Sequence, residues 1–203
     1  MLKEKKIGDV KLIKGDYFYK AEQPAAGKKE FRLTEGGGAL LDIGIYEMAM
    51  TCDLLRFEPE AVNGLWYKDP CGADMTTSIN LRYPGGIMAS LTCSMLFPAP
   101  QKLTIFGDKG RIEIPNFNRA DTATVWVYGT QVSDTTPGVK SSVPAGGTEE
   151  VLNYPHPING FEFQIMEVMQ ALEKGSLEAE TVSWQDSIQL HRLIDQVREC
   201  CEK

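Results

Sequence analysis

The sequence is poor in histidine and in positive charge. Its 203 residues include two histidines, and 21 Lys and Arg residues stand against 28 Asp and Glu residues, for a formal net charge of −7. A surface of that sign repels the phosphates of nucleic acids and the headgroups of anionic lipids. No apolar run approaches the ~20 residues that a membrane-spanning helix needs. We therefore expect no nucleic-acid partner and no membrane partner.

Cysteine is scarce and has no metal-binding spacing. The odd count of five argues against a disulfide framework, and the absence of C-x-x-C argues against a zinc site. The first residues also lack the apolar segment of an export signal. We expect a cytoplasmic protein without a metal site, in which small reduced thiols fill the core. The cysteines are Cys52, Cys71, Cys93, Cys200 and Cys201.

Three nucleotide-binding or nucleophile motifs are missing. Gly36 and Gly38 fit the start of G-x-G-x-x-G, but Leu41 stands where the third glycine belongs. Neither G-x-x-x-x-G-K-[ST] nor G-x-S-x-G occurs. This chain is therefore not expected to hold the phosphates of a nucleotide by itself.

Most of the sequence indicates strands. Residues 75–83 and 87–95 alternate apolar and polar side chains on either side of Pro84-Gly85-Gly86, which predicts an antiparallel hairpin with one buried face. The Gly-, Ser-, Thr- and Pro-rich residues 129–149 are expected to be mostly loop. Further strands are predicted at 11–19, 61–67, 103–106, 111–114 and 123–128, with a weaker one at 150–154.

Three helices are expected. Residues 39–55 and 159–174 show apolar side chains at helical spacing, and the second helix is expected to turn its apolar face inward. A third helix begins at Ser183, where Ser183 and Asp186 approximate a capping box. Because the strands are consecutive, we predict an α+β fold in which a large, mostly antiparallel, open-faced sheet carries helices on one face. The apolar residues predicted to point inward in the second helix are Phe161, Ile165, Val168, Met169 and Leu172.

The stretch from Gly36 to Tyr46 is the best candidate for chemistry. Its three leading glycines allow close approach of a ligand to the backbone, and a helix start follows them. Asp42 and Tyr46 are four residues apart, so their side chains should project side by side from that helix. Spacing alone favours a second interpretation, in which Asp42 stabilises the helix start and Tyr46 is a partly buried core aromatic.

The same stretch, with Arg32 and Leu33 before it, resembles the Gfo/Idh/MocA oxidoreductases. It is most similar to the branch that contains dihydrodiol dehydrogenase and glucose–fructose oxidoreductase, because tyrosine rather than the commoner histidine stands at position 46. The resemblance extends over nearly the whole chain. Its other motifs are Ile7–Val10, Phe106–Pro115, Asn159–Glu162 and Ser183–Ser187.

The resemblance implies that residues 1–203 are a single C-terminal domain for substrate binding and oligomerisation. An N-terminal Rossmann domain, with a catalytic lysine in a Glu-Lys-Pro segment, would bind NAD or NADP and is absent here. Tyr46 would exchange the proton that accompanies hydride transfer to or from a sugar, polyol or diol, with Asp42 beside it. An unperturbed tyrosine has a pKa of about 10, so the phenol needs a neighbouring cation to work near neutrality.

The implied binding residues surround this pair. Arg32, Gly38 and His156 are expected to bind the substrate, and Gly36 and Gly37 to contact the cofactor. The expected partners are a small-molecule substrate and further copies of the chain, in a homodimer or higher homo-oligomer formed through the open sheet face. The alternative function is a non-enzymatic module that associates through the polar face of the sheet. That polar face contains Thr76, Ser78, Asn80, Arg82, Ser90, Thr92 and Ser94.

Overall fold

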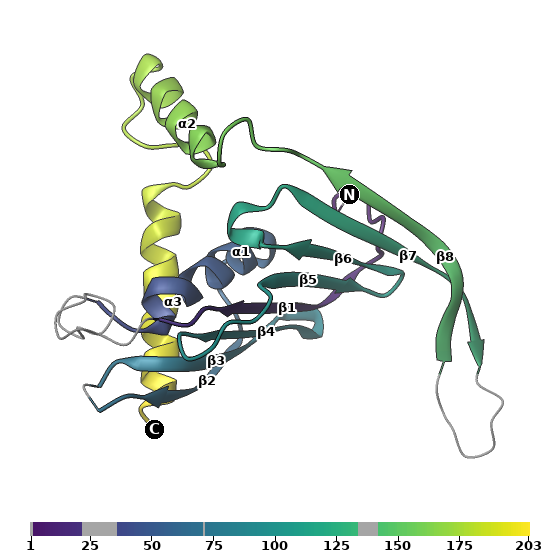
Figure 1. Cartoon of the computed structure of the whole chain (residues 1–203), viewed down its shortest axis with the longest axis horizontal. Coiled ribbons are helices and arrows are strands. Elements are labelled where there is room, and N and C mark those ends of the chain that lie inside the picture. Colours follow the sequence, from purple (N-terminus) through teal and green to yellow (C-terminus); the bar gives the residue numbers. More distant parts are fainter. Residues whose placement is uncertain (1, 22–35, 71, 134–141) are drawn as a thin grey trace.

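The computed structural model describes residues 2–21, 36–70, 72–133 and 142–203. Within these ranges eight strands form one sheet in the order β2-β3-β4-β1-β5-β6-β7-β8 (Figure 1). All neighbouring strands are antiparallel except β1 and β4, which run parallel. The predicted α+β fold with a largely antiparallel sheet is thus confirmed. The strands are β1 (Val10–Phe18), β2 (Ala61–Lys68), β3 (Asp74–Tyr83), β4 (Ile87–Ser94), β5 (Lys102–Gly107), β6 (Gly110–Pro115), β7 (Thr122–Ser133) and β8 (Ser142–Asn153).

The predicted hairpin is formed by β3 and β4. A 3₁₀ turn, Pro84–Gly86, joins the strands, and Gly85 takes the positive φ of +77° that glycine adopts without a steric penalty. Ile79 and Leu81 are buried, whereas Asn80 and Arg82, which alternate with them along β3, are exposed. The alternation therefore has one buried and one open face, as the sequence predicts.

The expectation of a loop over residues 129–149 is wrong. β7 and β8 are twelve residues each and form a long hairpin at one edge of the sheet, with residues 134–141 between them outside the described ranges. Strand pairing depends on backbone hydrogen bonds, which Gly, Ser and Thr make as well as apolar residues do. Among the residues of this hairpin whose burial is described, only Val125 is buried, so this part of the sequence carries no alternation to reveal the strands.

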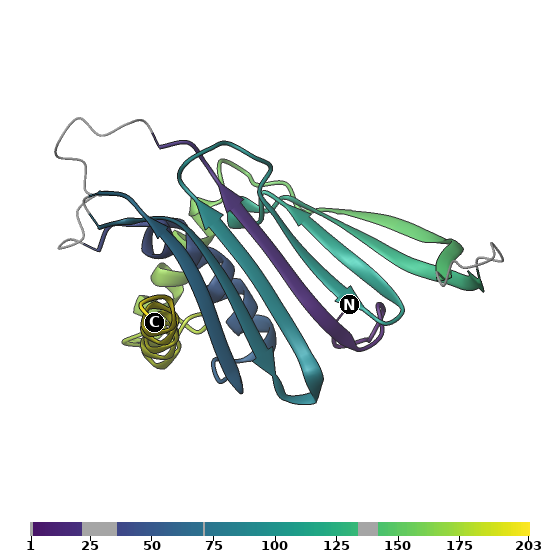
Figure 2. The ribbon, with the colours of Figure 1, turned by 90° about the horizontal axis from the view of Figure 1, so that it is seen from below.

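Two helices cover one face of the sheet. α1 (Ile45–Leu55) packs on β1 and β4, and α3 (Trp184–Cys201) packs on β2 (Figure 2). Leu193, Ile194 and Val197 are the buried residues of α3. Its predicted capping box is confirmed, since the Ser183 hydroxyl accepts from Asp186 N at 3.1 Å and the Asp186 carboxylate accepts from Ser183 N at 2.9 Å.

The prediction that the second helix turns its apolar face inward is wrong. α2 (Phe161–Glu173) has no buried residue, and the five side chains expected to point inward are between 53% and 70% exposed. In Figure 1 this helix stands clear of the sheet. The apolar periodicity of a helix predicts which side needs a partner but not whether the partner lies within the same chain. None of the described helices is long and apolar enough to cross a membrane.

Candidate active site

The Gly36-to-Tyr46 motif forms a π-helical turn (Leu40–Gly44) that continues directly into α1. π-helical turns are rare in proteins, and those that do occur are often found at functional sites. The buried Asp74 carboxylate, at the start of β3, holds this turn because it accepts hydrogen bonds from Leu40 N and from the Thr77 hydroxyl, both at 2.7 Å. The motif is therefore anchored to the sheet just before its reactive residues.

Two glycines of the motif allow this close packing. Gly38 has a φ of +119°, and a Cβ there would lie 1.9 Å from Asp74 Oδ1. A Cβ at Gly44 would lie 2.9 Å from Cys93 Sγ on β4. Only glycine fits both positions without displacement, so each lets the turn lie close against β3 or β4. The role of Gly38 in binding substrate stays a prediction.

Asp42 lies in the π-helical turn, where a strand residue holds its side chain. The Tyr19 hydroxyl, just beyond the end of β1, donates a hydrogen bond of 3.0 Å to Asp42 Oδ2. The carboxylate is half-buried and keeps a second oxygen for other donors.

Tyr46 begins α1 and is 47% exposed, the most open side chain of the motif's helical part. Its ring lies 5.8 Å from the ring of Tyr17, centroid to centroid, at an interplanar angle of 52°. Tyr17 is buried, packs edge-on against Phe117 at 5.8 Å, and accepts a hydrogen bond of 2.8 Å from Asn118 Nδ2. A phenol that is half-exposed to solvent thus makes a tilted ring contact with a phenol that is fixed.

Burial is the main cause that raises the pKa of Tyr17, and the charges of Tyr46 and Asp42 add to it. The Arg119 guanidinium and the hydrogen bond from Asn118 act in the opposite direction. The other four side chains therefore lie close enough to Tyr17 to affect its pKa. Tyr17 is consequently protonated at neutral pH.

Other predicted site residues lie at different distances from this pair. His156 contacts the surroundings of the pair rather than the pair itself, because its Nε2 lies 3.0 Å from the backbone oxygen of Arg119, whose guanidinium acts on Tyr17. Gly36 and Gly37 line a separate cavity of about 100 Å³ together with Lys68 and Arg198, and neither Asp42 nor Tyr46 lines it. Arg32 lies outside the described residues.

Sequence reasoning missed the residues that surround the pair. Tyr17 comes from β1 and Tyr19 from just beyond its end, and Asn118 and Arg119 come from the 3₁₀ turn Phe117–Arg119. The one available signal was that Tyr17 and Tyr19 are two residues apart on a predicted strand and so share a face. Nothing in the local sequence indicates that this face meets the motif.

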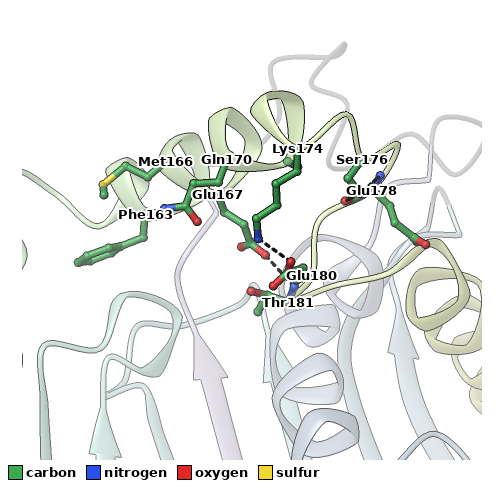
Figure 3. A pocket seen from close by; sticks show the side chains of 10 residues that line it. Phe163, Met166, Glu167, Gln170, Lys174, Ser176, Glu178, Glu180 and Thr181 are labelled. Carbon is green, nitrogen blue, oxygen red and sulfur yellow. Dashed lines mark hydrogen bonds and ion pairs between the residues drawn. The ribbon is translucent and has the colours of Figure 1, made fainter.

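The neighbouring α2 begins beside the same site. The His156 ring contacts Phe163 of α2 at 5.8 Å between centroids. Below the helix is a cavity of about 310 Å³, where Lys174 pairs with Glu180 at 2.7 Å and Glu167 accepts from Thr181 N at 2.7 Å (Figure 3). These contacts tie α2 to the segment that follows it, while its apolar side chains remain open.

A buried acid lies next to Tyr46 in sequence. Glu47 is 0% exposed, and neither of its carboxylate oxygens makes a hydrogen bond of normal geometry within the described residues. Burial, with a smaller contribution from Asp16, raises the pKa of this carboxyl well above its ordinary value, although the backbone of Tyr17 offsets part of the effect. Glu47 is therefore a neutral acid under the sheet.

Residues 1–113 match the family model for the GFO/IDH/MocA C-terminal domain. The trans-1,2-dihydrobenzene-1,2-diol dehydrogenase of Xenopus laevis is 33% identical over an alignment of 203 positions that covers 98% of this chain and 56% of that protein. The Xenopus tropicalis enzyme of the same name is 31% identical, over 97% of this chain and 56% of its own length. The chain thus spans little more than half the length of these relatives.

Solved structures share the fold. A 3-ketoreductase from Actinomadura kijaniata, in complex with NADP and TDP-benzene, superposes with a TM-score of 0.76 at 21% identity, over 98% of this chain and 56% of that one. An aldose–aldose oxidoreductase from Caulobacter crescentus, complexed with glycerol, gives a TM-score of 0.74 at 20% identity, over 99% of this chain and 56% of that one.

Proposed function

The chain belongs to the GFO/IDH/MocA family of oxidoreductases through its C-terminal domain, and on this premise we propose that it is the substrate-binding and dimerisation domain of a nicotinamide-dependent oxidoreductase. The proposed substrate is a sugar, polyol or diol, whose hydroxyl is oxidised or whose carbonyl is reduced. The relatives named as diol dehydrogenases and the ketoreductase with bound NADP support this substrate class and cofactor.

One observation of this chain carries the proposal. A half-exposed phenol, Tyr46, and a carboxylate, Asp42, share one side of the motif, and both act on the same buried neighbour, Tyr17. A core aromatic would be covered, and a carboxylate that only stabilised a helix start would not need a tyrosine from another element. The pair has the proton-exchanging group and the hydrogen-bond acceptor that the chemistry of a secondary alcohol needs.

In the proposed mechanism the bound nicotinamide supplies or accepts the hydride. Tyr46 donates the proton of its Oη to the carbonyl oxygen during reduction, and accepts the hydroxyl proton during oxidation. Asp42 accepts a hydrogen bond from a substrate hydroxyl through the oxygen that Tyr19 leaves available. The π-helical turn, fixed by Asp74, keeps the two side chains at a constant separation.

The nicotinamide end of the cofactor fits this site, because Tyr46 is open to solvent and Asp42 lies beside it. The rest of a dinucleotide needs a phosphate cradle, and the sequence contains no motif for one. We therefore assign cofactor binding mainly to a Rossmann domain outside these 203 residues. Residues 1–203 are assigned to a single substrate domain. The exposed apolar side chains of α2, which adjoin the site through His156 and Phe163, offer a surface for that domain.

Dimerisation is assigned to the open face of the sheet. Asn80 and Arg82 of β3 are exposed, and in Figure 2 α1 and α3 lie on one side of β3 and β4, so no described helix covers the other side. The same open face favours the alternative function, a non-enzymatic association module. The four described cysteines are free thiols, which supports the proposed cytoplasmic setting. Sedimentation tests the interface, and a strict monomer at high protein concentration would contradict it.

The central test is the Tyr46→Phe variant of the complete oxidoreductase that contains this chain. We expect it to lose most turnover on diol and sugar substrates while it keeps cofactor binding, because only the exchangeable proton is removed. An unchanged kcat would exclude Tyr46 as the proton donor. If the unsubstituted protein turns over none of these substrates, the association module becomes the better function.

A second test uses the 203-residue chain alone. Titration with NADH and NADPH, followed by nicotinamide fluorescence, should give no saturable binding at micromolar concentrations. Saturable binding would disprove the assignment of the cofactor site to another domain.

A further inference from the structure

We propose that the C-terminal end of β1 positions both reactive side chains of the motif, with Tyr19 holding the Asp42 carboxylate and Tyr17 holding the Tyr46 ring. The inference rests on the function proposed above. It gives Tyr17 and Tyr19 the role of positioning residues, which act on the substrate only through Asp42 and Tyr46.

The spacing of a strand matches the spacing of a helix at this place. Residues i and i+2 of a strand are about 6.6–6.8 Å apart and point to the same face. Residues i and i+4 of a helix are about 6 Å apart along its axis. Tyr17 therefore contacts Tyr46, and Tyr19 contacts Asp42. The two contacts lie side by side along the strand and the helix.

The first pair is polar. Tyr19 N donates to Ser94 O of β4 at 3.1 Å, so the backbone of Tyr19 is fixed to the sheet beyond the last residue of β1. From that position its hydroxyl donates to Asp42 Oδ2 at 3.0 Å. A hydrogen bond to one oxygen of a carboxylate fixes the rotation of the group and leaves the other oxygen directed elsewhere.

The second pair is aromatic. Tyr17 is held from three sides, because its backbone pairs with Cys93 of β4, its ring packs edge-on against Phe117, and its hydroxyl accepts from Asn118. Tyr46 has no such enclosure, since it is 47% exposed. The tilted contact at 5.8 Å is in the range that favours aromatic pairs, so the rigid ring restricts the open one.

The two phenols are also chemically distinct. The charged groups that face Tyr17 are Tyr46, Asp42 and Arg119, and burial is the largest cause of its raised pKa. Tyr17 thus stays a neutral packing partner. The exposed Tyr46 is left as the phenol of the pair that meets a substrate.

Kinetics of the complete oxidoreductase test both positioning residues. In Tyr19→Phe we expect kcat to fall about ten- to a hundredfold, with KM for the substrate and the thermal midpoint nearly unchanged. In Tyr17→Leu we expect a similar fall in kcat at temperatures well below the midpoint, which the loss of a buried ring lowers. Tyr17→Phe keeps the ring and should restore most of the activity lost in Tyr17→Leu. Tyr67→Phe, an exposed tyrosine on β2, is the matched control and should behave as wild type.

A second measurement uses the 203-residue chain and needs no turnover. With ¹³C-labelled tyrosine, the Tyr17 resonance is followed as a function of pH and assigned by its loss in Tyr17→Phe. Because the charge of Tyr46 raises the pKa of Tyr17, we expect that pKa to fall in Tyr46→Phe and to stay constant in Tyr67→Phe. If the pKa of Tyr17 is the same in Tyr46→Phe and Tyr67→Phe, then Tyr17 and Tyr46 are not coupled, and the aromatic pair is overturned.

The outcomes separate this inference from the proposed function. Wild-type kcat in Tyr19→Phe and Tyr17→Leu overturns the inference, and so does a loss of activity in Tyr19→Phe that follows a loss of thermal stability. Absence of turnover in the unsubstituted protein refutes the function instead. In that case the Tyr17 titration alone decides whether β1 positions Tyr46.

Discussion

α1 and α2 are both short helices rich in apolar residues, yet one is packed under the sheet and the other is open to solvent. α1 buries Met48 and Cys52 and even the acidic Glu47, whereas every residue of α2 remains at least partly exposed. The pattern of apolar residues therefore does not decide burial by itself. A helix is buried when the chain also supplies the surface opposite to it, and the described chain does so for α1 but not for α2.

The contrast also bears on the site. α1 carries Tyr46, the proposed proton donor, and is packed on the sheet. α2 contacts His156 through Phe163 at one end. The difference is consistent with a fixed site on the sheet and an open neighbouring surface, as proposed above. Three matched pairs of substitutions test the comparison.

The largest effect is expected at the glycines that border the two helices. Gly38→Ala, before α1, should destabilise the fold by about 4 kcal/mol, because it adds backbone strain and displaces the buried Asp74 from its hydrogen bonds. Gly175→Ala, after α2, meets no atom within 4 Å and should cost about 1–2 kcal/mol, from its φ of +68° alone. Urea unfolding measures both. Equal losses would contradict the distinction between the helices.

A smaller effect is expected from truncated methionines. Met48→Ala in α1 removes a fully buried side chain and should cost about 3 kcal/mol. Met169→Ala in α2, where the side chain is 56% exposed, should change the free energy of unfolding of the isolated chain by less than about 0.5 kcal/mol. A cost at Met169 comparable to that at Met48 would mean that α2 is already covered, for example by a second copy of the chain.

The smallest effect concerns two acids and depends on pH. The raised pKa of Glu47 means that the folded state keeps a proton which the unfolded chain releases above about pH 4.5. Glu47 therefore destabilises the fold increasingly as pH rises from that value, and Glu47→Met should stabilise it by about 1–2 kcal/mol at neutral pH and by less near pH 4.

Glu167 of α2 is the counterpart with the opposite sign. Hydrogen bonds from Thr181 lower the pKa of Glu167, so any stability that it contributes is present at neutral pH and is lost as pH falls through the folded-state value. Unfolding free energies of Glu47→Met and Glu167→Gln between pH 3 and 8 should diverge in opposite directions. Parallel pH profiles would show that Glu47 has a partner in solution.

Much of the fold follows from local patterns. Alternation predicts β3 and β4, the Pro84-Gly85-Gly86 turn predicts their connection, and the Ser183 capping box predicts the start of α3. The β7–β8 hairpin escaped prediction because, among the residues of its strands whose burial is described, only Val125 is buried. Local patterns also cannot reveal the absent partner of α2.

The site was predictable only along the helix. Helical spacing places Asp42 and Tyr46 on neighbouring turns, and this part of the expectation needs no tertiary information. Tyr17, Tyr19 and Asn118 join them through strand pairing and through a turn far along the chain, which leave no periodic signal. The chemistry of the pair thus depends on contacts that only the folded sheet provides.

The central position of β1 also has a consequence for how the protein folds. Leu12 pairs with Met88 on one side and with Phe106 on the other, whereas β2, β3 and β4 can pair in sequence, as can β5 with β6. β1 precedes both of its partner strands in the chain, and the nearer one, β4, begins only at Ile87. Insertion of β1 between two preformed hairpin units should then be the slow step of folding, since it closes the longest loops. Until that step, both edges of β1 are open to pairing with another chain, and Tyr17 and Tyr19 have not yet met the motif.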